Sequence, residues 1–281
     1  MNNYLTHWSL TRRKVFANCA RRFAISYIKN NSAQFPHKRR NKWRSPWDLM
    51  IQSTREVFFQ WLSDLHKNTI WTNKTIYSNI RFKIITNLYT FNATKGADFE
   101  RLRNQLTNQG YLRFKKLLRQ DLIRRLIGGK IKEWSFHKRI NPVKFGHLEV
   151  YCSPDIVFKL GKKWNLVRLN FQSERNQPYH DLELCTMLLW SRGNQYLPNL
   201  DNKFNVFGIY YHMGKWQQKH ISPTQQLLQE TKQLLEKDVH NMNLLLSDFN
   251  LTGDYDSLPL ATSKRYCKRC PYKKKCPVNS N

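Results

Sequence analysis

The chain is 281 residues long, which is enough for one large domain or two small ones with a sizeable core. Its 48 Lys and Arg residues against 19 Asp and Glu residues give a formal net charge of +29. This imbalance makes a polyanion the default partner, with nucleic acid first and an acidic membrane surface second. An Asn- and Lys-rich chain also results from drift in an AT-rich genome, but the abundant, clustered arginines argue against drift alone.

The chain has no obvious membrane or secretion signal. No segment reaches the roughly 18 to 20 uninterrupted apolar residues that span a bilayer. The first residues lack the apolar core of a signal peptide, so we expect a cytoplasmic protein without a membrane partner, although the basic start leaves an organelle transit peptide open. Three of the six cysteines are clustered, which in an intracellular protein favours a metal over disulfides.

The N-terminal half is predicted to be helical and basic. Residues 9–29 carry apolar side chains at helical spacing between basic pairs, which predicts one helix, and a charged connector follows at residues 38–44. Ser45 then supplies an N-cap and Pro46 the first position of a helix that runs through Trp61 or beyond.

Residues 70–127 are also predicted to be largely helical, with arginines and lysines interleaved among leucines. Their basic side chains form either a solvated amphipathic face or a face that follows a phosphate backbone, and the sequence does not distinguish the two.

The periodicity changes after Gly128 and Gly129 to an alternation of strands and helices. The predicted elements are a strand at 148–158, a turn at 160–163, a strand at 164–171, a helix at 181–190, and strands at 205–211 and 215–221. A capping box at Ser222, with Pro223 at the first helical position, then predicts a long last helix with an apolar face that includes Leu227 and Leu228.

The last residues hold a compact cysteine motif. Cys267, Cys270 and Cys276 form Cys-x2-Cys-x5-Cys, closed by Pro277. Two thiolates separated by two residues can chelate one centre, and the longer spacing lets a third join them. Because such centres generally take four ligands, the motif predicts a fourth ligand elsewhere, and an incomplete zinc knuckle is the alternative.

These elements together resemble a known family. A hairpin carrying Pro154 and Asp155, a second strand about a dozen residues later, a helix and the cysteine tail resemble the PD-(D/E)XK nucleases. Within them the chain resembles the RecB/AddB and CRISPR-associated RecB-like branch, which carries a [4Fe-4S] cluster. In that branch the fourth cysteine lies in an N-terminal helix reading roughly CPRRFY, and here residues 19–23 read Cys-Ala-Arg-Arg-Phe. The resemblance covers nearly the whole chain, from Trp8 to Pro277.

The resemblance implies an α/β (α+β) fold with a restriction-endonuclease-like core. It divides one integrated domain into a basic helical region at 1–146, the nuclease-like core at 147–260 and an iron–sulfur tail at 261–281. The implied ligands of the [4Fe-4S] cluster are Cys19, Cys267, Cys270 and Cys276. The cluster would join the two ends of the chain as a structural staple, and the remaining Cys152 and Cys185 are interpreted as small buried hydrophobes.

The catalytic positions that the resemblance implies are largely replaced. Asp155 matches the acid of the first strand. The replaced positions are Arg168 and Asn170 for the carboxylate and lysine of the second strand, Asp181 and Cys185 for Gln-x3-Tyr of the next helix, and Gln52 for a helical histidine. An arginine about 4 Å from a divalent ion is repelled by roughly 8 kcal/mol at an effective dielectric of about 20. The sequence therefore predicts a pseudo-nuclease.

A rebuilt active site is the alternative, in which the chain is an active DNA exo- or endonuclease using Mg²⁺ or Mn²⁺. Glu183 or Glu149 would then replace the lost acid, and Lys159 or Lys163 the lost base. Glu183 would otherwise be a solvated helix residue.

Without catalysis, the prediction is a DNA-binding subunit of a larger assembly with a helicase, nuclease or other DNA-processing partner. A third hypothesis is an architectural subunit that binds RNA or an acidic protein. Seven tryptophans offer surfaces on which single strands could stack, but most are expected in the core or an interface, so none is assigned; they are Trp8, Trp43, Trp47, Trp71, Trp134, Trp164 and Trp190. The basic residues predicted to bind nucleic acid are Arg113, Lys115, Lys116, Arg119, Lys162, Lys163 and Arg168.

Overall fold

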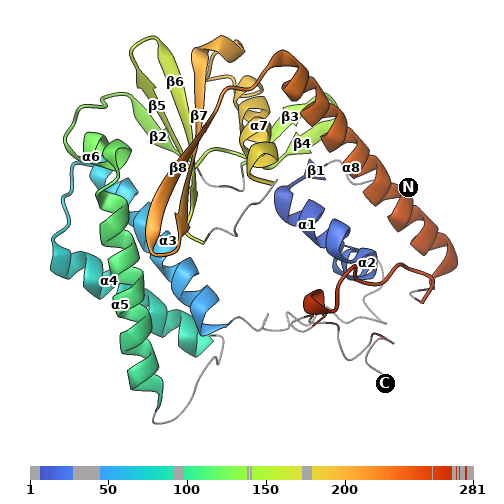
Figure 1. Cartoon of the computed structure of the whole chain (residues 1–281), viewed down its shortest axis with the longest axis horizontal. Helices are drawn as coiled ribbons and strands as arrows, with labels where there is room; N and C mark the ends of the chain where they lie inside the picture. The colour runs from blue at the N-terminus through green and yellow to red at the C-terminus, as the bar shows by residue number, and fades with distance from the viewer. Residues whose placement is uncertain are drawn as a thin grey trace.

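The computed structural model of the chain is a mixed α/β fold with helices on both faces of a five-stranded sheet (Figure 1). The residues that the structure describes are 7–27, 45–90, 98–137, 139, 141–172, 179–254, 256–267, 270, 272 and 276. The predicted charged connector at 38–44 and Pro277 lie outside them. Within the described ranges, no helix is both long enough and apolar enough to cross a bilayer.

The predicted helical character of the first half is confirmed in the described ranges. Its helices are α1 (Leu10–Asn18), α2 (Ala20–Tyr27), α3 (Pro46–His66), α4 (Asn73–Thr90), α5 (Asp98–Leu118) and α6 (Asp121–Ile127). Helix α3 begins as predicted, because the Ser45 hydroxyl accepts a hydrogen bond from the Asp48 N–H at 3.1 Å and Pro46 opens the first turn.

The prediction of one continuous helix at 9–29 was wrong, because the helix breaks at Cys19. Ser9 caps α1, and Cys19 has extended backbone, with φ −167° and ψ 105°. The Cys19 carbonyl accepts from the Phe23 N–H, while its sulfur accepts from the Arg22 N–H at 3.3 Å. Cys19 therefore ends one helix and caps the next, which is a local arrangement that helical periodicity does not reveal.

The main sheet has the strand order β2-β5-β6-β7-β8. Its strands are β2 (Trp134–Phe136), β5 (Ile156–Leu160), β6 (Lys163–Asn170), β7 (Phe204–His212) and β8 (Lys215–Ile221). Strands β6 and β7 are parallel and are joined by α7 (Tyr179–Arg192), while every other neighbouring pair is antiparallel. The predicted order strand, strand, helix, strand, strand, helix is confirmed.

A smaller sheet has the order β1-β4-β3 and consists of β1 (His7–Trp8), β4 (Leu148–Val150) and β3 (Val143–Phe145). The single strand predicted at 148–158 is therefore wrong, since its two halves, β4 and β5, belong to different sheets. Pro154 lies between them and has no N–H for a ladder. The boundary predicted at 146/147 falls in the turn between β3 and β4.

The long last helix, α8 (Gln225–Thr252), starts later than the capping box predicted. Thr224, not Ser222, is the N-cap, and its hydroxyl accepts from the Leu227 N–H at 3.1 Å. The buried face of α8 contains Leu228, whereas Leu227 is exposed. The helix ends at Gly253, whose positive φ of 64° favours glycine.

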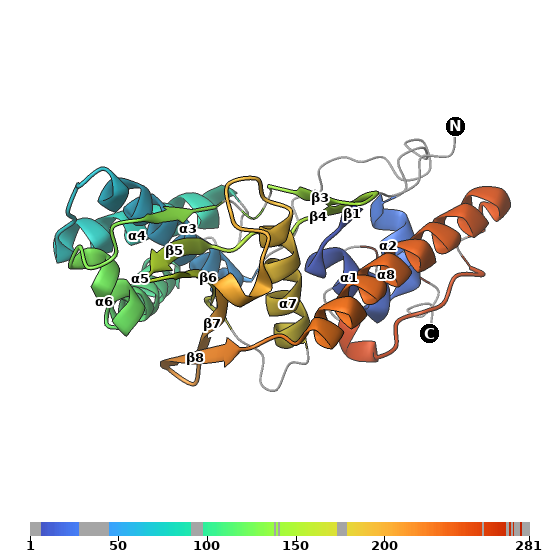
Figure 2. The same ribbon diagram turned by 90° about the horizontal axis from the view of Figure 1, so that it is seen from above.

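Side chains of the main sheet alternate between two helical layers. Ile156, Val167 and Ile209 pack in a core shared with α3–α6, whereas Val157 and Leu166 pack in a core shared with α7 and α8. Figure 2 shows the two layers on opposite sides of the strands. Residue 168 shares the parity of Leu166, so the alternation turns its side chain toward α7.

The two ends of the described chain lie side by side. The guanidinium of Arg21 donates to the carboxylate and carbonyl of Asp256 and to the carbonyl of Leu258. The backbone N–H of Thr262 donates to the carbonyl of Asn18 at 3.2 Å. In Figure 1, α1 and α2 accordingly lie between α8 and the C-terminal segment. Ordinary packing and hydrogen bonds thus bring the N-terminal helices to the cysteine tail.

Candidate functional site

A fully buried carboxylate, Asp155, lies at the entry to β5 and is surrounded by arginines. Arg139 binds both of its oxygens, with Nε 2.8 Å from Oδ1 and Nη2 2.7 Å from Oδ2. The backbone N–H of Leu169 donates to Oδ2 at 2.7 Å, and Arg139 also donates to the carbonyl of Leu169. Asp155 is therefore held by a bidentate guanidinium, which occupies the oxygens that a metal ligand would present.

Arg168 on β6 lies between two carboxylates. Its Nη1 is 3.5 Å from Asp155 Oδ2, and its Nε is 3.0 Å from Glu183 Oε1 on α7. Its Nη2 donates to the sulfur of Cys152 at 3.4 Å. The side chain is only 2% exposed, although its strand position corresponds to an apolar core position. Arg168 thus takes the place between Asp155 and Glu183 where two carboxylates would otherwise face each other.

A third arginine, Arg55 on α3, has its Nη2 3.6 Å from Asp155 Oδ1. Burial, and then the nearby charge of Arg139, lower the pKa of Arg55 to about 10. Burial alone would raise the pKa of Asp155, but Arg139, Arg168 and Arg55 outweigh it and hold that pKa well below its usual range. Burial alone would lower the pKa of Arg168, but Glu183 and Asp155 raise it. Asp155 and Arg168 therefore stay charged at every ordinary pH.

A cavity of about 580 Å³ lies beside this network, between the start of α1 and the ends of β4 and β6; we call it the arginine cavity. Residues lining it are His7, Ser9, Leu10, Thr11, Arg12, Lys14, Arg139, Tyr151, Cys152, Arg168, Asn170, His180 and Glu183. Four of these side chains are cationic and one is a carboxylate. The cavity therefore favours an anion.

Two cations of α1 face this cavity without a carboxylate of their own. Arg13 is paired with Asp238 of α8 at 2.8 Å. By contrast, Arg12 donates to the carbonyl of His7 at 3.3 Å, and Lys14 lies 5.0 Å from the ring centre of Tyr179. Neither has a carboxylate within 4.0 Å among the residues that the structure describes. Their charges are thus not neutralised by a neighbouring carboxylate in that part of the chain.

Some buried polar atoms beside the cavity make no hydrogen bond within the described ranges. Nε and Nη1 of Arg168 are buried and make no hydrogen bond within the described ranges, so the 3.0 Å approach to Glu183 is an ion pair with poor hydrogen-bond direction. The buried hydroxyl of Tyr210 also makes no hydrogen bond within the described ranges, and burial raises the pKa of Tyr210. The Tyr210 ring stacks on His180, with ring centroids 4.0 Å apart. Gly208, paired with Arg168 across the strands, leaves room for that ring.

The other positions implied by the resemblance are not all brought together. Asn170 lines the arginine cavity. Gln52 instead donates to Glu56 on α3, Asp181 forms an ion pair with Lys219, and Cys185 is buried. Cys152 is buried as predicted, and burial raises the pKa of each of these two thiols to about 11.

Glu183 is the predicted substitute acid, and it does lie across Arg168 from Asp155. The alternative that Glu183 is a solvated helix residue is wrong, because it is buried. Glu149, Lys159 and Lys163, the other substitutes considered, do not line the cavity.

The residues predicted to bind nucleic acid do not form one surface. Arg113 is buried, donates to the carbonyl of Phe171 and lies over the Tyr211 ring, so the prediction of a surface contact was wrong for it. Arg119 and Lys116 are exposed on or next to α5, Lys115 is half-buried, and Lys116 donates to the carbonyl of Gly214. Exposed Lys162 and Lys163 lie at the β5–β6 turn. That turn is five paired residues from Asp155 and Arg168, or about 17 Å at roughly 3.4 Å per residue.

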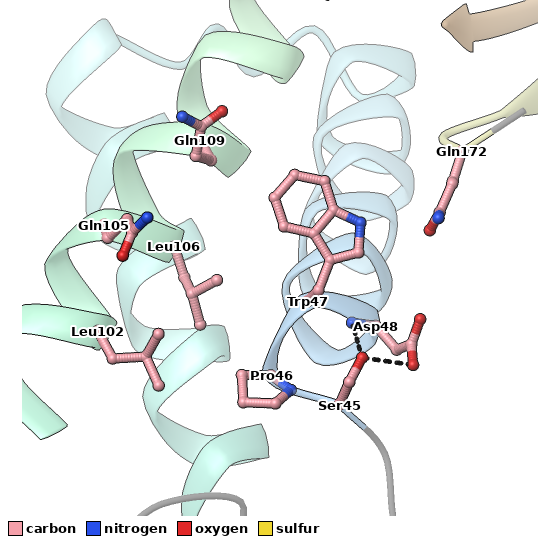
Figure 3. Close-up of a pocket in the computed structure, with 9 residues that line it drawn as sticks. All are labelled: Ser45, Pro46, Trp47, Asp48, Leu102, Gln105, Leu106, Gln109 and Gln172. Carbon is pink, nitrogen blue, oxygen red and sulfur yellow. Dashed lines mark hydrogen bonds between the residues drawn. The ribbon is translucent and has the colours of Figure 1, made fainter. Parts of the chain in front are cut away.

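A second cavity, of about 530 Å³, lies between α3 and α5 (Figure 3). Trp47 is 40% exposed at its wall, and Gln105 and Gln109 face it from α5. Its one charged lining residue, Asp48, accepts a hydrogen bond from Ser45. This cavity offers an aromatic ring and amides, but no cation for a phosphate.

The predicted cluster cysteines are gathered from both ends of the chain. Cys19, Cys267, Cys270 and Cys276 are half-buried free thiols. Burial raises the pKa of the Cys270 thiol, and the neighbouring Cys19 and Cys267 add to that effect. No group of three or more His, Cys, Asp or Glu side chains within the described ranges has the geometry of a metal site. The residue types fit a sulfur-ligated centre.

Sequence reasoning missed Arg12, Lys14, Arg55 and Arg139 as residues of this site. Arg12 and Lys14 follow the N-cap of α1, which is the only local signal that marked them. Arg55 and Arg139 come from a helix and a loop, and no spacing rule connects them with Asp155.

Comparison of the chain with models of known protein families gives no match, and comparison with curated proteins gives none either.

Proposed function

We propose that the chain is a nucleic-acid-binding protein that uses a nuclease-like fold to hold a phosphate group rather than to cut it. The observation that carries this proposal is the position of Arg168 between Asp155 and Glu183. A divalent metal at that position would face the guanidiniums of Arg168, Arg139 and Arg55, and like charges within 4–6 Å repel strongly at low dielectric. The same positive charges attract a phosphate oxygen.

The topology also supports this proposal. The acid precedes β5, the replaced position lies on the adjacent β6, and α7 follows with Glu183 before the parallel strand β7. This is the order that the resemblance to PD-(D/E)XK nucleases requires. The net charge of +29 adds the long-range attraction to a polyanion, for which we take DNA as the first choice.

We further propose a [4Fe-4S] cluster on Cys19, Cys267, Cys270 and Cys276. It is supported by the hydrogen bonds between residues 18–26 and 256–272, which place both cysteine-bearing segments together. When bound, the cluster would supply a covalent link across the chain ends. Anaerobic protein with about four irons per chain is the expected result, and stoichiometric zinc without iron would refute it.

Binding and cleavage are tested together. Labelled single- and double-stranded DNA is incubated with the protein and Mg²⁺ or Mn²⁺. The expected result is a shift without cleavage, with an affinity that falls by roughly 10³ to 10⁵ between about 50 and 200 mM salt if six to ten phosphates are contacted. Metal-dependent cleavage that Asp155→Ala abolishes would overturn the proposal, and preferential retention of RNA in competition would favour an RNA-binding subunit.

A further inference from the structure

We infer that the arginine cavity binds a phosphate monoester, the group carried by a phosphorylated strand end or by a mononucleotide. This inference rests on the proposed function, since it specifies which part of a nucleic acid enters the same cavity. A monoester carries about −1.5 to −2 charges near neutral pH, whereas each internal phosphodiester carries one. A monoester therefore differs from an internal phosphodiester in its charge and in its position at the end of a strand.

The charges of the cavity match the monoester. Its cationic side chains are Arg12, Lys14, Arg139 and Arg168, and Glu183 is its one carboxylate, which leaves a surplus of three positive charges. Behind the wall, the charge of Asp155 is offset by Arg55. A singly charged phosphodiester would leave most of this surplus uncompensated, while a monoester removes two of the three charges. The cavity accordingly favours the more highly charged group.

Backbone hydrogen-bond donors at the start of α1 point to the same ligand. The first turn of α1 borders the cavity, and Ser9 caps only the N–H of Arg12 there. The N–H groups of Leu10 and Thr11 have no intrahelical acceptor, because they lie in the first turn. A phosphate oxygen satisfies such donors and is further stabilised by the helix dipole.

The size and walls of the cavity suit a strand end better than a continuous duplex. Its volume of about 580 Å³ lies in the range of sites that enclose one small ligand. Rings of His7, Tyr151 and His180 line it, and His180 is already stacked on Tyr210. Aromatic faces of this kind stack on an unpaired base. The phosphate and its first base can thus share one cavity.

The test compares matched oligonucleotides by fluorescence anisotropy with the whole protein. Single strands of roughly 12 nucleotides carry a 5′-phosphate, a 3′-phosphate or only hydroxyl ends, with the label at the opposite end. Thymidine monophosphate and thymidine serve as competitors that separate a free nucleotide from a strand end. We expect one phosphorylated strand to bind about tenfold or more tightly than the hydroxyl strand, since a charge-assisted hydrogen bond contributes about 1.5–3 kcal/mol.

Variants assign the effect to the cavity. Lys14→Ala and Arg12→Gln are expected to remove most of the preference for the phosphorylated end, because each lacks a carboxylate partner and its loss leaves no buried counter-charge. Lys237→Ala, an exposed lysine of α8, is the matched control and should retain the preference. Lys14→Ala and Arg12→Gln proteins that keep the full preference would overturn the inference.

The outcomes also separate this inference from the proposed function. Equal affinity for phosphorylated and hydroxyl strands would refute the monoester site while leaving nucleic-acid binding intact. Binding of thymidine monophosphate, but not thymidine or any oligonucleotide, would support the monoester site and refute the proposed nucleic-acid function.

Discussion

Replacing Arg168 by methionine tests whether the buried charge network is organised around this residue. The change removes a buried guanidinium whose nitrogens lie 3.0 Å from Glu183 and 3.5 Å from Asp155. At an effective dielectric of about 20, such pairs attract by roughly 5 kcal/mol each. Relief of the desolvation of Arg168 offsets a large part of this, so the expected loss in the free energy of unfolding is about 3–5 kcal/mol.

The loss in the free energy of unfolding should come mainly from Glu183, because Arg168→Met leaves its buried charge unpaired. Asp155 keeps the bidentate Arg139 and the N–H of Leu169, whereas Arg168 is the ion-pair partner recorded for Glu183 among the described residues. Adding Glu183→Gln to Arg168→Met should therefore recover about 1–3 kcal/mol, because it removes the unpaired buried charge.

The assay is urea denaturation of the wild type, both single variants and the double variant, followed by tryptophan fluorescence. Lys237→Met, an exposed position on α8, is the control and should change stability by less than about 0.5 kcal/mol. A loss below about 1 kcal/mol for Arg168→Met, or a double variant less stable than Arg168→Met, would refute the reasoning.

Three further predictions concern other parts of the chain. Because the pKa of Asp155 is depressed in the folded state, its ionised form stabilises the fold above about pH 4, and this contribution is lost as the pH falls through the native pKa. The difference in the free energy of unfolding between the wild type and Asp155→Asn, measured by urea titration, should therefore shrink below about pH 4. A difference that stays constant with pH would contradict this. Gly208→Ala would place a methyl group in the ring of Tyr210 and should cost about 1–3 kcal/mol in the same assay, but less when Tyr210→Ala is also present. Cys19→Ser should lower the iron content of anaerobically purified protein while Cys185→Ser retains it, and equal iron in both would argue against Cys19 as a ligand.

Local patterns in the sequence were sufficient for most elements of the fold. Alternation and turn residues predicted the β5–β6 hairpin, and the Ser45–Pro46 signal predicted the start of α3. These predictions succeeded because they depend on backbone preferences and on which face of an element is apolar. Those preferences act between residues that are close together in the sequence, so the sequence alone reveals them.

The predictions failed where a segment that was predicted to form one element forms two. Residues 148–158 read as one strand, but Pro154 divides them between two sheets. Residues 9–29 read as one helix, but Cys19 ends α1 and caps α2. The division of residues 148–158 involves a partner from a distant part of the chain, because β4 pairs with β1, whereas the break at Cys19 is a local arrangement that helical periodicity does not reveal.

The sequence by itself determined that Asp155 is accompanied by an arginine at position 168, where the resemblance implies a carboxylate, and that the chain carries a large positive charge. Only the tertiary structure decided what those charges do. Arg55, Arg139 and Glu183 come from a helix, a loop and another helix, and their charges act through distances of 2.7 to 3.6 Å in a buried site rather than through spacing along the chain. Burial makes each of those contacts strong, and burial is a property of the packed molecule.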